Sequence, residues 1–306
     1  MAPYLLKRLF IAVPTLWLLI TICFFLVRLA PGGPFDGERV LDPIIQERLL
    51  ASYDLDKPLW QQYTNYLKDL LHGDLGPSFK YRDYSVNDLI AQGFPISLRL
   101  GLCAITVAII LGISIGTLAA WRKNSFIDSA IMMVAILGIA IPNFVKAPLF
   151  IFLFAIILGW LPAGGWADGA WQNMILPVIA LALPHMAVIA RLTRANLIEV
   201  LHSSFIRTAR AKGLSTFTVL TRHALRPALL PIFSYLGPAI AGIITGAVVV
   251  EHIFQIPGLG TFLVQGAINR DYTTVLGLVI LLGSLMIICN LIVDILYAWL
   301  DPTIRY

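Results

Sequence analysis

The chain has 306 residues, of which 58% are hydrophobic and only 13% are charged, and its formal net charge is +5. A soluble domain of this length needs far more charged side chains to cover its surface, so the composition excludes an ordinary soluble protein. The apolar residues are gathered in long blocks, and a helix needs about 20 such residues to cross about 30 Å of hydrocarbon. The sequence therefore predicts an all-α integral membrane protein.

Six apolar blocks follow one another along the chain. They cover approximately residues 9–29, 96–120, 130–158, 174–190, 229–250 and 275–300. The first is longer than the apolar part of a signal peptide, which has about 7–15 residues, so we expect a retained helix. The third is too long for one straight span, and Pro142 and Pro148 interrupt it, which predicts a kink or a short re-entrant start. Small residues four apart, such as Gly112 and Gly116, predict faces where helices pack closely.

Lysine and arginine residues in the connections predict the orientation, because they are enriched on the cytoplasmic side of membrane proteins. The first two blocks are flanked by Lys7, Arg8, Arg122 and Lys123. The 191–226 segment adds seven more basic residues against a single acid, Glu199. We therefore expect both termini and the 191–226 segment in the cytoplasm. The 31–95 segment, with ten acids and six lysines or arginines, is expected outside.

The chain divides into three predicted parts. They are residues 1–30 with the first helix, a periplasmic cap segment over 31–95, and a permease-like core over 96–306 that contains the 191–226 loop. Within the cap segment, Asp42 followed by Pro43 is typical of a helix start. Residues 59–71 are apolar at helical spacing, and Gly73 fits the end of that helix. The cap segment either packs on the protein's own helices or meets a soluble partner or the transported solute.

No motif of a known catalytic site occurs in the sequence. It has no G-x-x-x-x-G-K-[ST] phosphate loop for ATP and no H-E-x-x-H zinc motif, and its five histidines are scattered. No serine, histidine and acid are spaced in a way that indicates a nucleophile. We therefore predict that the chain is not itself an enzyme and holds no metal or cofactor.

Charged and polar residues inside the apolar blocks are functional candidates, because lipid makes them costly. Lys146 lies between Pro142 and Pro148. It either faces a central cavity and attracts a carboxylate, or extends along the helix to the outer interface. We name Lys146 and Asn143 as candidate residues of a substrate path. His185 is expected to be hydrogen-bonded between helices.

The stretch "RTARAKGLS", residues 207–215, carries three cations and no acid. Apolar residues at helical spacing predict a short helix here, capped by Ser203 or Ser204 and ended by Gly213. Ala209 and Gly213 are four residues apart, so they are expected to share a face to which another backbone can come close. This arrangement predicts a docking surface. The alternative is a loop whose cations only meet lipid headgroups.

The longer stretch "ARAKGLSTFTVLTRHALRPALLP" resembles the cytoplasmic loop of permeases in binding-protein-dependent ABC importers. In that family a short coupling helix, with Glu-Ala-Ala, three residues and then Gly, fits a cleft on the ATPase subunit. Gly213 matches that glycine and Ala209 the second alanine, whereas Arg207 and Thr208 replace the usual Glu and Ala. Five stretches are similar to the peptide and nickel subgroup: "RTARAKG", "RLAPGGPF", "GDLGPSFKYRDYSVNDLI", "VVVEHIFQIPGLG" and "DILYAWLDPTIRY". The chain length and the third of these stretches are most similar to the B-type permeases of oligopeptide importers.

The resemblance implies the type I ABC importer permease fold, with six transmembrane helices and a partly helical periplasmic insertion between the first two. It implies that the chain couples to the ATPases through Arg207, Thr208, Ala209, Arg210, Ala211, Lys212 and Gly213. We further expect an outer gate or a contact with the binding protein at Glu251, Phe254, Trp60 and Tyr81.

The partners that the resemblance implies are a second permease subunit of the C type, two ATPase subunits that bind ATP and Mg, and a peptide-binding protein. The expected location is the inner membrane of a bacterium, and the expected substrate an oligopeptide. Dipeptides, murein peptides and nickel chelates are alternatives, because selectivity in such importers resides largely in the binding protein. A secondary transporter would need charge pairs inside the spans, which offer mainly Lys146 and Asp294. No nucleic acid is expected, because the basic loop has few aromatic residues for stacking.

Overall fold

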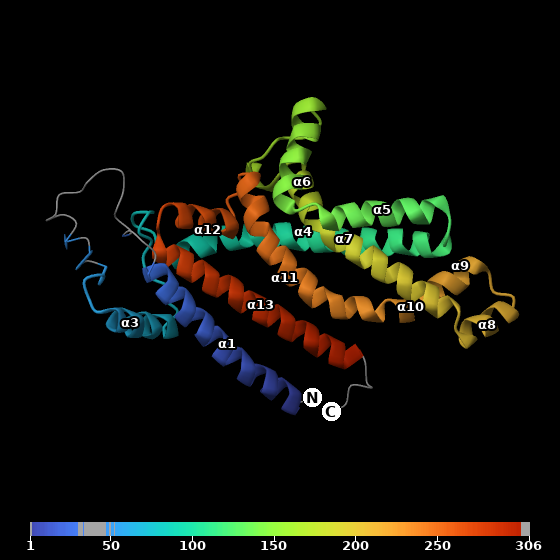
Figure 1. Ribbon diagram of the computed structural model, residues 1–306, viewed down its shortest axis with the longest axis horizontal. Coiled ribbons are helices and arrows are strands. Elements are labelled where there is room, and N and C mark those ends of the chain that lie inside the picture. Colours follow the sequence, from blue (N-terminus) through green and yellow to red (C-terminus); the bar gives the residue numbers. More distant parts are fainter. Residues whose placement is uncertain (1, 30–32, 34–46, 49, 52, 301–306) are drawn as a thin grey trace.

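The computed structural model describes residues 2–29, 33, 47, 48, 50, 51 and 53–300. In these residues the regular structure is helical, with one isolated β-bridge between Pro77 and Ser85. The long helices lie together in an elongated bundle (Figure 1). Within the described ranges, four helices are long and apolar enough to cross a membrane, and two bent pairs raise the number of candidate spans to six. The predicted all-α membrane class is confirmed.

The helices follow the six apolar blocks. Four long helices are α1 (Ala2–Leu29), α4 (Val86–Trp121), α7 (Trp171–Leu201) and α13 (Tyr272–Leu300). The third block is divided between α5 (Phe126–Ala140) and α6 (Asn143–Phe150), with a π-helical segment (Ile151–Ile157) after it, and the fifth block is α11 (Leu230–Ile253). Shorter helices are α3 (Leu59–Leu71), α8 (Ser204–Ala211), α9 (Thr216–Thr218), α10 (Leu225–Ala228) and α12 (Leu259–Ile268), and a second π-helical segment (Val219–Ala224) joins α9 to α10.

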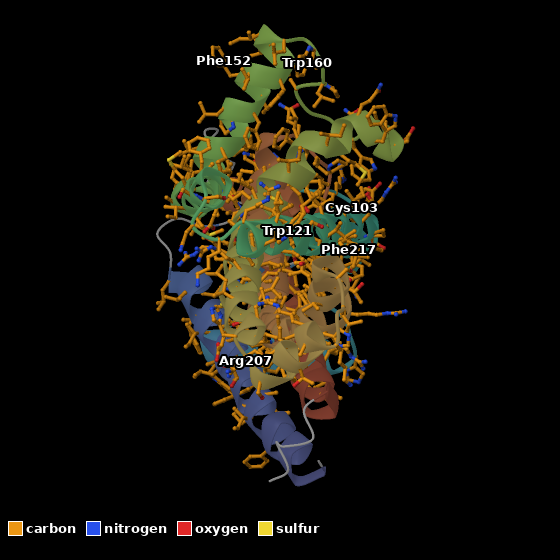
Figure 2. All side chains as sticks on the ribbon, turned by 90° about the vertical axis from the view of Figure 1, so that its right-hand side faces the viewer. Cys103, Trp121, Phe152, Trp160, Arg207 and Phe217 are labelled. Atoms are coloured by element: carbon orange, nitrogen blue, oxygen red, sulfur yellow. The ribbon has the colours of Figure 1, made fainter. Side chains whose placement is uncertain are left out.

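The third apolar block is sharply broken. After α5 the chain turns by 108°, and α6 with its π-helical continuation leaves the bundle as an arm (Figure 1). Pro142 precedes α6 in an extended conformation, and it lacks the N–H that a continuous helix would need. Phe152 and Trp160 are exposed at the far end of this arm (Figure 2). The predicted kink is therefore confirmed as a change of direction.

The pair α4 and α7 forms the centre of the bundle, where glycines bring the two backbones together. Gly112 faces Ile189, and Gly116 faces Ala190. A Cβ atom on Gly116 would lie 2.5 Å from the carbonyl oxygen of Ala190, so only glycine permits this approach. The close-packed face predicted from these two glycines is confirmed.

Helix α1 packs along α13, and α3 lies against this pair. Their shared cluster contains Ile20, Phe24, Leu276 and Ile280, with Tyr63, Tyr66, Leu67 and Leu70 of α3 packed on it. The hydroxyl groups of Thr21 and Tyr63 are hydrogen-bonded at 2.6 Å, which ties α3 to α1. The helix predicted over residues 59–71 is thus confirmed, and it packs on the protein's own helices. The predicted N-cap Asp42 lies outside the described residues.

Two features differ from the sequence prediction. Helix α4 begins at Val86, earlier than its apolar block, because Ser85 and Asp88 form a capping box over the polar first turn. The Ser85 hydroxyl accepts the Asp88 N–H at 3.2 Å, and the Asp88 carboxylate accepts the Ser85 N–H at 2.9 Å. The second feature is α12, which no apolar block predicted, since ten residues are too few for a span.

Candidate functional site

The basic stretch of the sequence forms α8, as predicted, and the chain leaves it through Gly213. Gly213 has φ +79°, a left-handed conformation that favours glycine and ends the helix. Ser203 lies just before the helix, but its hydroxyl donates to the carbonyl of Val200 at 2.6 Å and does not cap an α8 N–H. The helix and its C-terminal stop are confirmed, and the predicted serine side-chain cap at Ser203 is not found.

Helix α8 rests on a small hydrophobic cluster that belongs to the loop itself. We call it the loop cluster, and it comprises Ala120, Leu197, Ile206, Ala209, Val219, Leu220, Ala224 and Ala228. These residues come from α4, α7, α8 and the segment that leads to α11, so the loop holds its own shape against the ends of two spans. The cluster therefore ties α8 to the ends of α4 and α7 that are expected in the cytoplasm.

The predicted outward face of small residues is wrong in one respect. Ala209 is only 7% exposed and points into the loop cluster, whereas Gly213 is exposed. The two residues therefore do not share an open face. The outward side of α8 instead carries Arg207, Thr208, Arg210, Ala211 and Lys212, all of which are exposed.

Exposed aromatic side chains accompany these cations. Phe205 and Phe217 are 49% and 74% exposed on either side of the basic stretch. Arg207 and Phe217 are both at the surface of this end of the molecule in Figure 2. Cations beside exposed aromatic rings are typical of the surfaces that proteins use to bind one another.

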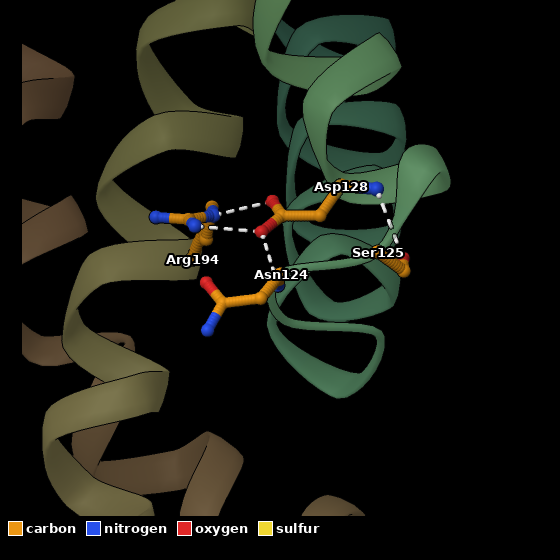
Figure 3. Close-up of polar contacts among 4 residues, drawn as sticks. All are labelled: Asn124, Ser125, Asp128 and Arg194. Carbon is orange, nitrogen blue, oxygen red and sulfur yellow. Dashed lines mark hydrogen bonds and ion pairs between the residues drawn. The ribbon is translucent and has the colours of Figure 1, made fainter.

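An ion pair that the sequence analysis missed joins this loop to the third span (Figure 3). Asp128, in the first turn of α5, is almost fully buried and accepts from Arg194 of α7 with both carboxylate oxygens, at 2.5 Å from Nε and 2.7 Å from the terminal nitrogen. The N–H of Asn124 donates to the same carboxylate at 3.0 Å. The sequence offered one clue, an acid three residues after Ser125, which is typical of a helix start. Nothing in the local pattern indicated its partner 66 residues later.

The break between α5 and α6 is held by Lys146. Its side chain is only 2% exposed, and Nζ donates to the carbonyl of Gly138 at 2.9 Å. Gly138 belongs to the last turn of α5, where carbonyl groups lack partners in the helix and attract a cation. Lys146 thus does not extend to the interface as one alternative expected. Its hydrogen bond pairs a carbonyl group in the last turn of α5 that the break would otherwise leave without a partner inside an apolar region.

Asn143 and His185 lie near the same break. The Asn143 amide nitrogen approaches Gly246 of α11, and its Oδ1 is buried with no hydrogen-bond partner in the described chain. His185 of α7 is hydrogen-bonded through Nδ1 to the Tyr235 hydroxyl of α11 at 3.0 Å. The expectation of an interhelical hydrogen bond for His185 is confirmed. The two predicted path residues, Lys146 and Asn143, thus both lie on α6, with Lys146 hydrogen-bonded to α5 and Asn143 close to α11.

The four residues expected at an outer gate are not brought together. Glu251 and Phe254 at the end of α11 are buried, whereas Trp60 on α3 is 68% exposed. Tyr81 is half-buried, and its ring meets the edge of Phe262 of α12. Glu251 accepts the N–H of Gly260 at 2.7 Å, and the Phe254 carbonyl accepts the N–H of Gly165 at 2.8 Å. Glu251 therefore holds the turn between α11 and α12, and Phe254 joins the end of α11 to the loop before α7.

A second buried carboxylate, also missed from the sequence, lies beyond the other end of α12. Asp271 is fully buried before α13. Its oxygens accept from the Ser78 hydroxyl at 2.5 Å and from the backbone N–H groups of Phe79 and Lys80 at 3.1 and 3.3 Å. It also accepts from the hydroxyl and N–H of Thr274, at 2.8 and 3.2 Å. We call Glu251, Gly260, Asp271 and residues 78–80 together the α12 corner.

A bundle of apolar helices that can cross a membrane up to six times, within the ranges the structure describes, is the architecture of a multi-pass membrane protein. Residues 112–306 match the protein family described as the binding-protein-dependent transport system inner membrane component. The chain is 56% identical over 306 residues, all of both proteins, to the oligopeptide transport system permease protein OppB of Escherichia coli (strain K12). It is 55% identical over the same length to OppB of Haemophilus influenzae, and 45% identical over 305 residues to the dipeptide transport system permease protein DppB of Bacillus subtilis (strain 168), covering 98% of that protein. The chain belongs to this family of binding-protein-dependent inner membrane permeases.

Proposed function

We propose that this chain is one of two permease subunits of a bacterial ATP-driven importer of oligopeptides, and that it forms half of the translocation path. The observation that carries the proposal is the 56% identity to an oligopeptide permease over the whole length of both proteins. The partners would be a second permease of the C type, two ATPase subunits that hold ATP and Mg, and a peptide-binding protein. The exposed apolar arm formed by α6 supports the presence of another membrane subunit.

The orientation follows from the basic residues. In our proposal α8 and both termini are on the cytoplasmic side, because this side collects lysine and arginine. The start of α1 and the end of α13 lie at the same end of the bundle, consistent with an even number of crossings (Figure 1). Helix α3 and the α12 corner are then on the outer side, where the peptide-binding protein delivers its ligand.

Helix α8 is the proposed coupling element. Its exposed residues Arg207, Thr208, Arg210 and Lys212 would seat in a cleft of an ATPase subunit, with the cations meeting acids or backbone carbonyls there. Ala209 lies on the opposite side of α8, where it anchors the helix on the loop cluster. When ATP closes the ATPases, α8 moves with its cleft, and the loop cluster passes this motion to α7 and α11.

The ion pair between Asp128 and Arg194 would pass the motion of α7 on to α5. It joins α7 to the first turn of α5, so a displacement of the cytoplasmic end of α7 also pulls on the third span. The far end of α5 is fixed to α6 by the hydrogen bond from Lys146. The region around Lys146 and Asn143 would therefore change shape as the path opens outward or inward.

The test is ATP hydrolysis and peptide uptake by the complete importer in proteoliposomes. We expect Thr208→Trp to reduce peptide-stimulated hydrolysis by at least about tenfold, because the bulky ring blocks the seat of α8 while the loop cluster stays intact. The matched control is Thr64→Trp, on α3 at the other end of the molecule, where the threonine is also exposed. Normal uptake with Thr208→Trp would remove α8 from coupling.

The 45% identity to a dipeptide permease makes a dipeptide importer the second candidate. Uptake of peptides of two to five residues separates the two, and uptake limited to dipeptides would favour the second. A nickel-chelate importer would transport none of these peptides, and a murein-peptide importer would take up cell-wall peptides in preference to them. Uptake without any ATPase subunit would indicate a secondary transporter. Such a transporter would need charge pairs inside the spans, and the hydrogen bond of Lys146 to a backbone carbonyl argues against this candidate.

A further inference from the structure

Helix α3 carries more apolar surface than its contact with the bundle uses. Tyr63, Tyr66 and Leu67 pack on the cluster that α1 and α13 share. Trp60 and Leu71 of the same helix are 68% and 87% exposed. The coupling mechanism gives these two large side chains no contact, so their surroundings require a separate account.

The exposed apolar side chains continue the face that packs on the bundle. At about 100° per residue, Trp60, Leu67 and Leu71 lie within about 40° of one another around the helix axis. We call these three residues the α3 row. Gln61 and Lys68 are also exposed, and the same geometry puts them on the side of α3 opposite to the bundle contact. The α3 row therefore lies between the contact with the bundle and the polar side of the helix, as in an amphipathic helix.

The contact with α1 places α3 beside the final turns of a membrane span. Residues Phe10–Leu29 of α1 are apolar enough and long enough to cross a membrane. The Tyr63 hydroxyl is hydrogen-bonded to Thr21 at 2.6 Å, and its ring centroid is 5.3 Å from that of Phe24. Thr21 and Phe24 precede the end of the span by about 12 and 8 Å along the helix, at about 1.5 Å per residue. Figure 1 shows α3 beside this end of α1.

The surface of α1 that reaches this contact is apolar and exposed. Leu18, Ile22 and Leu29 are 52%, 48% and 70% exposed. Phe25 follows Ile22 by three residues and precedes Leu29 by four, so it lies on the same face of α1. Its ring centroid is 5.5 Å from that of Tyr63 on α3. Exposed apolar side chains of a span contact lipid, so the lipid-facing surface of α1 continues directly to α3.

From this continuity we propose that α3 is an interfacial anchor, and that the α3 row inserts among the lipids at the Leu29 end of α1. In the proposed orientation this is the outer leaflet. Trp60 suits the position because tryptophan is enriched at membrane interfaces, and Lys68 can extend toward lipid phosphates while Gln61 stays in water. An interfacial helix buries its apolar face about 5–10 Å deep, which fits a helix held beside the final turns of a span. A soluble partner would approach from the water and meet the polar side of α3 first.

The experiment measures which reagents reach a nitroxide spin label on α3 of the complete importer in phosphatidylcholine vesicles, without binding protein. The free cysteines Cys23, Cys103 and Cys289 are first replaced by alanine. Leu71→Cys then places the label in the α3 row, and Gln61→Cys is the matched control on the polar side of the same helix. Oxygen is concentrated in lipid, whereas a neutral nickel chelate stays in water. We expect the oxygen-to-nickel accessibility ratio at position 71 to be at least about fivefold that at position 61, as burial among acyl chains predicts.

Trp60→Phe provides an independent measurement, in case the variants without native cysteines fail to assemble. The difference in tryptophan emission between the unaltered importer and this variant is the contribution of Trp60. Vesicles of lipids brominated on the acyl chains should reduce this contribution to about half or less, because an interfacial ring lies close to the upper acyl chain.

Three results would overturn the proposal. One is an equal accessibility ratio at positions 71 and 61, and another is a Trp60 contribution that brominated lipids leave unchanged. The third is protection of the label at position 71 from both reagents, which would assign the α3 row to a protein. That protein would be another subunit of the importer if the protection is present from the start, and the binding protein if protection appears only when it is added.

Discussion

The α8 end and the α12 corner place their charged residues in opposite ways. At the α8 end the cations Arg207, Arg210 and Lys212 are exposed, and the helix is held by apolar contacts beneath it. At the α12 corner the carboxylates of Glu251 and Asp271 are fully buried and bonded to the protein's own backbone. The first arrangement leaves charge available to a partner, and the second uses charge to fix loops to the helices.

This difference has an energetic basis. A buried carboxylate is tolerated only when hydrogen bonds replace the water it has lost, so its partners are held in one geometry. Exposed cations keep their water and contribute little to folding, so they are free to change partners. Under the proposed coupling, the α8 end moves with an ATPase subunit while the α12 corner keeps its shape, and the two arrangements suit these two roles.

Asp271→Ala should have the largest effect on stability. The change leaves the hydroxyl of Ser78 and the backbone N–H groups of residues 79 and 80 without their acceptor in a buried place. We expect a loss of about 3–5 kcal/mol in the free energy of unfolding. Thermal unfolding in detergent measures it, with Asp56→Ala, an exposed acid, as the control. An unchanged midpoint would show that the α12 corner does not depend on this carboxylate.

Breaking the pair of Asp128 and Arg194 should have an intermediate effect. Because the arginine side chain is 27% exposed, we expect Asp128→Asn to lower stability by only about 1–3 kcal/mol. The same variant should transport fewer peptides per ATP hydrolysed, since α5 no longer follows α7. Exchanging the two charges, Asp128→Arg with Arg194→Asp, should restore part of the ratio, and Glu199→Gln, at an exposed acid of α7, should not alter it. A ratio that stays normal in Asp128→Asn would exclude this pair from coupling.

Lys146→Met should have the smallest effect on stability, about 1 kcal/mol. The loss of the hydrogen bond to Gly138 is partly offset, because a buried charge is also removed. We expect uptake of peptide acids and peptide amides to change equally, because the lysine acts on the helix break. A selective loss of peptides with a free carboxylate would instead place Lys146 in the substrate path.

Local sequence patterns were sufficient to predict the membrane spans and α8. A block of apolar residues long enough for the membrane has few alternatives to a helix, because lipid offers no partner for backbone groups. The stretch from Ser203 to Gly213 has a helical period, cations and a terminal glycine, and it formed the expected helix. Its periodicity did not reveal that Ala209 faces inward, because that depends on Val219 and Leu220, which the chain brings back against it.

The sequence by itself determined that this protein is a helical membrane protein with a basic loop, because hydrophobic length and charge are properties of short stretches of chain. The prolines of the third block predicted its break, and only the tertiary structure decided the 108° angle, the pairing of Asp128 with Arg194, and the contact of Asp271 with residues 78–80. The last two features join residues far apart in the chain, and the partner of a buried charge is chosen by how the helices pack, which no local pattern records.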